Sequence, residues 1–175
     1  MILLSVIIAF FSLFSREIDQ NNPAEIAGEI LERTATFANK RYPLHTCGTI
    51  MGMPNGNVQV LGLCFQAKTL LSRDQLRSLT IKCATELIQQ INSNEHIQRF
   101  LVKRPFTMQE VQIIIYNKDK NGDEPHDPLI ATAQISKGIL TFRTTDPKHT
   151  YTYNNRFKET YEEAVEIINS QQNKA

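Results

Sequence analysis

The spacing of apolar residues predicts a helix over NNPAEIAGEILERTATFANKR, near the start of the chain. Asn22 can cap this helix, Pro23 suits its first position, and Glu25 completes an Asn-x-x-Glu capping box. Residues that recur every three or four positions form one face that can pack on a core. The members of this face are Ile26, Ile30, Leu31, Thr34, Phe37 and Ala38.

Two further stretches show the same helical spacing. In SRDQLRSLTIKCATELIQQINSN, Ser72 and Gln75 form a capping box, and in RFKETYEEAVEIINSQ the pattern predicts a helix that begins near Arg156. A short helix is predicted over EHIQRFLVKR, and it should end before Pro105. The apolar stripe of the helix capped by Ser72 contains Leu76, Leu79, Cys83, Leu87 and Ile91. The apolar stripe of the helix that begins near Arg156 contains Phe157, Tyr161, Ala164, Val165 and Ile168.

Strand-like segments lie between these helices. The stretch HTCGTIMGMPNGNVQVLGLCF predicts a β-hairpin that turns at PNG, and VQIIIYN predicts a strand rich in β-branched residues. A second hairpin is predicted from DPLIATAQI, the turn SKG and ILTFRTT. Hairpins and helices occur in separate runs, so we predict an α+β fold. Its two layers are an antiparallel sheet of four to six strands, from the two hairpin regions, and helices packed on one face.

The register of the first hairpin decides where two cysteines point. A three-residue loop places Cys47 opposite Leu63 and turns Cys64 to the other face, whereas a two-residue loop places Cys47 opposite Cys64. The two-residue loop needs a backbone hydrogen bond that Pro54 cannot donate. We therefore expect the three-residue loop and no disulfide between these strands. A bridge, if one forms, should join Cys83 to a strand cysteine.

The first fifteen residues, MILLSVIIAFFSLFS, carry no charged side chain. This run is shorter than the roughly 20 apolar residues that a spanning helix needs. We expect residues 1–15 to be a signal peptide, or an N-terminal membrane anchor if they are not cleaved, and residues 16–175 to form a single α+β domain. A buried N-terminal helix is the alternative. The pattern predicts export, periplasmic or secreted, and therefore an oxidising compartment.

Composition narrows the possible partners. Across 175 residues, 19 lysines and arginines stand against 18 aspartates and glutamates, which gives a net charge of +1 and no basic surface of the kind that nucleic acids require. The three cysteines contain no C-x-x-C pair, so neither a zinc ribbon nor a redox motif is indicated. We expect no cofactor, and membrane contact only through residues 1–15 if they are retained.

Two local patterns are weak candidates for chemistry. His45 and Cys47 alternate onto one side of a strand, as a thiol–imidazole pair would, but no orienting carboxylate is identifiable. Asp119, Asn121 and Asp123 occupy the first, third and fifth positions of an EF-hand-like loop. The loop lacks the glycine and the bidentate glutamate that calcium binding needs, so an ordinary polar loop is the preferred interpretation.

A binding function is the leading hypothesis. The absence of a catalytic motif and the neutral charge favour an exported, non-catalytic binding or interaction protein whose partner is a protein or small ligand outside the cytoplasm. The candidate binding residues are Tyr151, Tyr153, Met51 and Met53, which could surround a binding surface. The alternative is a hydrolase or thiol-dependent enzyme whose site is assembled from distant loops, with Cys47, His45, His126 and His149 as its candidate residues.

Overall fold

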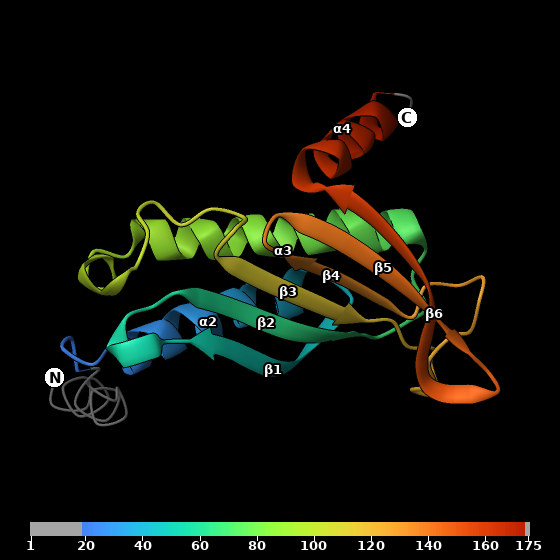
Figure 1. Ribbon diagram of the computed structural model, residues 1–175, viewed down its shortest axis with the longest axis horizontal. Helices are drawn as coiled ribbons and strands as arrows, with labels where there is room; N and C mark the ends of the chain where they lie inside the picture. The colour runs from blue at the N-terminus through green and yellow to red at the C-terminus, as the bar shows by residue number, and fades with distance from the viewer. Residues whose placement is uncertain (1–18, 174–175) are drawn as a thin grey trace, which may run out of the picture.

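The computed structural model describes residues 19–173, so the predicted leader at residues 1–15 lies outside the described residues (Figure 1). None of the helices in the described part is long and apolar enough to cross a membrane. In chain order the elements are α2 (Pro23–Arg41), β1 (Leu44–Gly52), η2 (Pro54–Gly56), β2 (Val60–Ala67), α3 (Arg73–Ser93), η3 (Gln98–Phe100), β3 (Val111–Tyr116), β4 (Thr132–Ser136), β5 (Ile139–Asp146), β6 (His149–Thr160) and α4 (Tyr161–Gln172).

The strands form one six-stranded sheet in the order β1-β2-β3-β4-β5-β6. Neighbouring strands are antiparallel except β2 and β3, which run parallel with Gly62 opposite Gln112. The predicted α+β class is confirmed, but the expectation of a wholly antiparallel sheet is wrong at this pair. The reason is the connection: the chain leaves β2, returns along α3, and enters β3 in the same direction, as a crossover helix allows.

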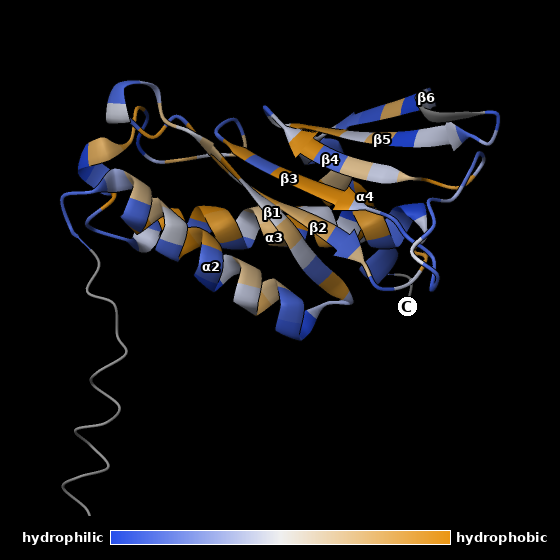
Figure 2. Cartoon of the chain, turned by 90° about the horizontal axis from the view of Figure 1, so that it is seen from below, coloured by the Kyte–Doolittle hydropathy of each residue, from blue (hydrophilic) through white to orange (hydrophobic). Residues whose placement is uncertain are grey.

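The hydrophobic core lies between one face of the sheet and the helices α2 and α3. On β2 and β3, buried residues alternate with half-buried ones, and the buried set is Leu61, Leu63, Phe65, Val111, Ile113 and Ile115. Figure 2 shows hydrophobic residues concentrated on the central strands, with hydrophilic ones prominent on the outer part of α2. As predicted, α3 buries Leu76, Cys83, Leu87 and Ile91, and Leu79 is half-buried. The other face of the sheet carries the half-buried set, and none of the helices within residues 19–173 packs on it (Figure 2).

The beginnings of α2 and α3 follow the predicted capping residues. Asn22 accepts a hydrogen bond from the backbone of Ala24, and Ser72 and Gln75 form the reciprocal capping box. Glu25 acts differently from the prediction, because its carboxylate accepts from the Asn22 side chain and from the backbone N–H of Asp19.

Two helix predictions are wrong in extent. The last helix begins at Tyr161, because residues 156–160 continue β6 and Thr160 caps the helix in a box with Glu163. The segment EHIQRFLVKR forms only the short turn η3, in which the Gln98 side chain bonds the last carbonyls of α3. In both segments tertiary hydrogen bonds override the local helical spacing.

A buried ion pair attaches β6 to α3. Arg77 Nε and Nη2 donate to the two carboxylate oxygens of Glu159 at 2.6 and 3.2 Å, and Asp74 holds Nη1. Arg77 and Glu159 are only 4% and 8% exposed. Burial lowers the pKa of Arg77, but the hydrogen bonds to Glu159 and Asp74 outweigh it and raise the pKa overall. The bidentate contact therefore stabilises a charged pair in the layer between the sheet and the helices.

Replacing Glu159 with Gln should destabilise the fold, because it leaves the buried Arg77 guanidinium with only Asp74 as a charged partner. We expect the free energy of unfolding to fall by about 3 kcal/mol, as for other broken buried pairs. Urea denaturation followed by circular dichroism measures this. Glu162→Gln is the matched control, since Glu162 is exposed on α4 and should change stability by less than about 0.5 kcal/mol. Equal effects of the two variants would contradict the assignment.

Candidate functional site

The uncovered face of the sheet contains a hollow of about 340 Å³. We call it the open-face hollow. The side chains that line it come from the four strands β3, β4, β5 and β6, and they are Ile114, Tyr116, Thr132, Gln134, Arg143, Tyr153 and Arg156. Ligand pockets are typically about 300–1,000 Å³, so this volume suits a small ligand.

The strand register brings these residues together. Tyr116 pairs with Thr132, Thr132 with Arg143, and Arg143 with Arg156, so one row of four side chains crosses the sheet. Residues in one such row share a face of the sheet. The neighbouring row adds Ile114 and Gln134, which pair with each other.

Irregular pairing of β5 with β6 adds Tyr153 to the hollow. The register shifts after Arg143, so that Thr145 pairs with Tyr153 although Arg143 pairs with Arg156. Extra residues of this kind bend a strand and increase its twist. The Arg143 guanidinium lies over the Tyr153 ring, 5.6 Å from its centroid, which is a cation–π distance.

The floor of the hollow contains a polar atom without a partner. Thr132 is 2% exposed, and its Oγ1 makes no hydrogen bond. Among the described residues, no other buried side-chain nitrogen or oxygen lacks a partner. A buried hydroxyl without a partner costs about 1–3 kcal/mol, and a bound water, ion or ligand oxygen would remove that cost.

Two arginines that line the hollow, Arg143 and Arg156, are paired on adjacent strands. Arg143 is half-buried and donates from Nη1 to Oε1 of Gln134 at 2.9 Å, and Arg156 is exposed. Neither guanidinium forms an ion pair with a carboxylate in the described part of the chain. Like charges placed directly opposite on adjacent strands are destabilising, unless an anion lies between them.

Tyr116 closes one side of the hollow as a neutral phenol. Burial raises the pKa of Tyr116, and the nearby Cys64 and Tyr153 groups raise it further. Glu124 contributes in the same direction, but its carboxylate is already paired with Lys118 at 3.1 Å. The hollow therefore combines two cationic side chains with neutral hydroxyls.

Of the predicted binding residues whose side chains are described, only Tyr153 lies at this hollow. Tyr153 lines it, whereas the side chain of Tyr151 lies outside the described part. Met51 pairs with Leu61, so it lies on the helix-facing side of the sheet, and its methyl group lies near Gly28 of α2. Met53 packs against the core. The predicted set is therefore not one surface.

The predicted register of the β1–β2 hairpin is wrong. Gly52 pairs with Val60, and Gly48 instead of Cys47 pairs with Cys64. A bulge between Thr46 and Gly48 then shifts the register by one residue. The loop is longer than either predicted loop, because Pro54–Gly56 form a 3₁₀ turn. As a result Cys47 and Cys64 lie beside each other on the uncovered face.

The predicted thiol–imidazole pair has no orienting group in the described residues. His45 and Cys47 are both exposed on β1, and no hydrogen bond joins the His45 ring to a described residue. Partial burial raises the pKa of Cys47, which lowers the fraction of reactive thiolate at neutral pH. Catalysis by this pair stays a prediction that the geometry does not support.

The described side chains among the remaining candidate site residues form hydrogen bonds close to their own loops. Asp119 Oδ1 accepts the backbone N–H groups of Asn121 and Asp123 at 2.8 and 3.0 Å, and these bonds lower the pKa of Asp119. His126 Nδ1 contacts Thr145 Oγ1 at 3.1 Å, and the His149 side chain lies outside the described part. No group of three or more His, Cys, Asp or Glu side chains that could hold a metal exists within residues 19–173.

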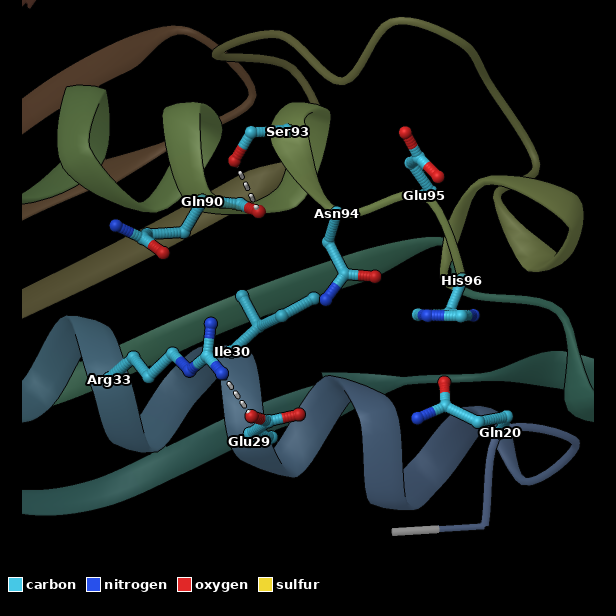
Figure 3. A pocket seen from close by; sticks show the side chains of 9 residues that line it. All are labelled: Gln20, Glu29, Ile30, Arg33, Gln90, Ser93, Asn94, Glu95 and His96. Atoms are coloured by element: carbon cyan, nitrogen blue, oxygen red, sulfur yellow. Dashed lines mark hydrogen bonds and ion pairs between the residues drawn. The ribbon is translucent and has the colours of Figure 1, made fainter.

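A second hollow lies between the helices α2 and α3 and measures about 490 Å³ (Figure 3). Its polar side chains partly satisfy one another, since Arg33 pairs with Glu29 and Ser93 donates to the carbonyl of Gln90. Figure 3 shows His96 and Glu95 beyond the end of α3, without a bond between them. No buried polar atom without a partner lies here, so this larger hollow is a weaker site than the open-face hollow.

Sequence reasoning found one residue of the open-face hollow and missed the others. The alternation in β4 and β5 could have placed Thr132, Gln134 and Arg143 on one face, but helical spacing assigned Arg156 to the last helix. Comparison of the chain with family models, with curated proteins and with solved structures found no match in any of the three.

Proposed function

We propose that the protein is a non-catalytic binding protein that holds a small anionic ligand in the open-face hollow. The ligand carries a carboxylate or phosphate group, because both offer the paired oxygens that a guanidinium binds. The observation that carries the proposal is the Oγ1 of Thr132, which has no partner among the described residues and lines the same hollow as two arginines that form no ion pair with a described carboxylate.

Each group in the hollow has a role in this proposal. Arg143 is held by Gln134 and Tyr153, so its position costs little entropy when a ligand binds. Arg156 is exposed and approaches the anion from the rim. Thr132 donates its hydroxyl proton to a ligand oxygen at the floor. The rings of Tyr116 and Tyr153, with Ile114, surround the less polar part of the ligand.

Removal of either arginine should weaken anion binding by at least tenfold, because each charge-assisted hydrogen bond contributes about 1.5–3 kcal/mol. Isothermal titration calorimetry of the purified chain with inorganic phosphate, citrate and benzoate provides the measurement, repeated for Arg143→Gln and Arg156→Gln. Lys158→Gln is the control, since Lys158 is the next residue on this face of β6 and is exposed outside the hollow. If all three variants lose affinity for the anion equally, the effect is one of general charge, and the proposed binding site is contradicted.

Substitution of Thr132 tests what its hydroxyl contributes to binding separately from what the charge of the arginines contributes. Thr132→Val removes the unpartnered hydroxyl, so the ligand-free protein should gain about 1 kcal/mol of unfolding free energy while losing affinity for the anion. Thr132→Ser keeps the hydroxyl and should retain affinity. Thermal unfolding with and without the anion measures both effects. If Thr132→Val binds the anion as tightly as the parent protein, the proposed role of this hydroxyl is contradicted.

The proposal places binding outside the cytoplasm, as the uncharged segment at residues 1–15 predicts. We expect the chain recovered from its native cells to occur in the medium or the envelope, with an N-terminus beyond residue 15 if the leader is cleaved. Cell fractionation and N-terminal sequencing check this. Recovery of the chain beginning at Met1 in the cytoplasmic fraction would contradict export.

A further inference from the structure

The bulge in β1 brings two cysteines together on the uncovered face of the sheet. Thr46 pairs with Phe65 and Gly48 pairs with Cys64, so Cys47 is the extra residue of the bulge, next to the partner of Cys64. Adjacent strands lie about 4.7–4.9 Å apart. A disulfide requires Cα atoms about 4.4–6.8 Å apart, so this spacing is suitable.

The Cys64 side chain lies beside the bulge. A Cβ atom added to Gly48, the neighbour of Cys47, would lie 3.6 Å from Cβ and 4.0 Å from Sγ of Cys64. Burial raises the pKa of Cys64, and the nearby Cys47 thiol raises it further. Both thiols are free, and Cys47 is exposed to reagents.

We propose that Cys47 and Cys64 form a reversible cross-strand disulfide by exchange with a low-molecular-weight disulfide of the glutathione type. This modification site does not depend on the proposed anion binding. It also differs from the pairing that the sequence favoured, because Cys83 is buried under the opposite face, in the layer formed by α3.

The exchange takes two steps. The exposed Cys47 loses its proton to solvent, and its thiolate attacks one sulfur of the small disulfide; a mixed disulfide forms and one small thiolate leaves. The Cys64 thiol then loses its proton, and its thiolate attacks Cys47 Sγ. The protein S–S bond forms and the second small thiolate leaves. Two cysteine thiols are oxidised and one small disulfide is reduced to two thiols.

The bridge would lie beside the open-face hollow. Cys64 pairs with Ile114, which lines the hollow, and the charge of a Cys64 thiolate contributes to the raised pKa of Tyr116. Bridge formation removes that thiolate and restrains β1, which is the edge strand of the sheet.

The test uses the full chain, reduced, purified and incubated with mixtures of reduced and oxidised glutathione. We expect the intact mass to fall by two hydrogen atoms and a digest without reduction to contain a peptide that links Cys47 to Cys64. The rate should keep rising above the ordinary pKa of a thiol, because burial raises the pKa of both cysteines.

Variants at the three cysteines identify the pairing. Cys47→Ser and Cys64→Ser should abolish the bridge, and Cys64→Ser should stop at the mixed disulfide. Cys83→Ala should still form the bridge, since burial raises the pKa of Cys83 to about 12 and keeps it unreactive. Three results would each overturn the proposal. They are a stable glutathione adduct on the parent chain, unreacted thiols at both Cys47 and Cys64, and a linked peptide that contains Cys83.

Discussion

The ion pair between Arg77 on α3 and Glu159 on β6 is the contact on which the position of the open-face hollow depends. It lies at the end of β6 that leads into α4, in the helix-facing layer, and it fixes where that strand meets the core. Since Arg143 pairs with Arg156 only three residues before Glu159, the register that the ion pair secures also sets the two arginines opposite each other. A buried pair of this kind adds little net stability over apolar residues of similar volume, whereas removal of one partner leaves a buried charge without its partner. Any other register of β6 would separate Glu159 from Arg77 and carry that cost.

The second constraint is that helices cover only one face of the sheet. Along β3, Val111, Ile113 and Ile115 are buried by α3, so Ile114 and Tyr116 must point to the uncovered face. Even regular pairing twists a sheet. The register shifts between β5 and β6 add to this irregularity next to the hollow, where the Arg143 guanidinium lies over the Tyr153 ring. The hollow thus lies where irregular pairing borders a regular core.

Regular elements could be predicted from the sequence, whereas the irregular ones could not. The stripe of Leu76, Cys83, Leu87 and Ile91 and the alternation in VQIIIYN depend only on local spacing, and both occur as expected. The bulge near Cys47 and the continuation of β6 through Arg156 depend on partners distant in sequence. A strand register changes with one inserted residue, so the proline argument for the hairpin placed Cys47 on the face of Leu63, which is wrong. The parallel pairing of β2 with β3 likewise depends on how α3 crosses the sheet.

The features that local rules missed are the ones that lie closest to the candidate sites. A bulge places Cys47 beside Cys64, the Arg143 guanidinium lies over the Tyr153 ring where the β5–β6 register shifts, and the buried Thr132 hydroxyl has no partner among the described residues. Each lowers stability or disrupts a regular ladder, and neither the apolar core nor the helix caps need any of them. Sequences that fold consistently at every level tolerate such departures mainly where function requires them. These three departures are spread from the edge hairpin to β6, and all of them affect the face of the sheet on which no described helix packs, which supports that face as the place to test for binding.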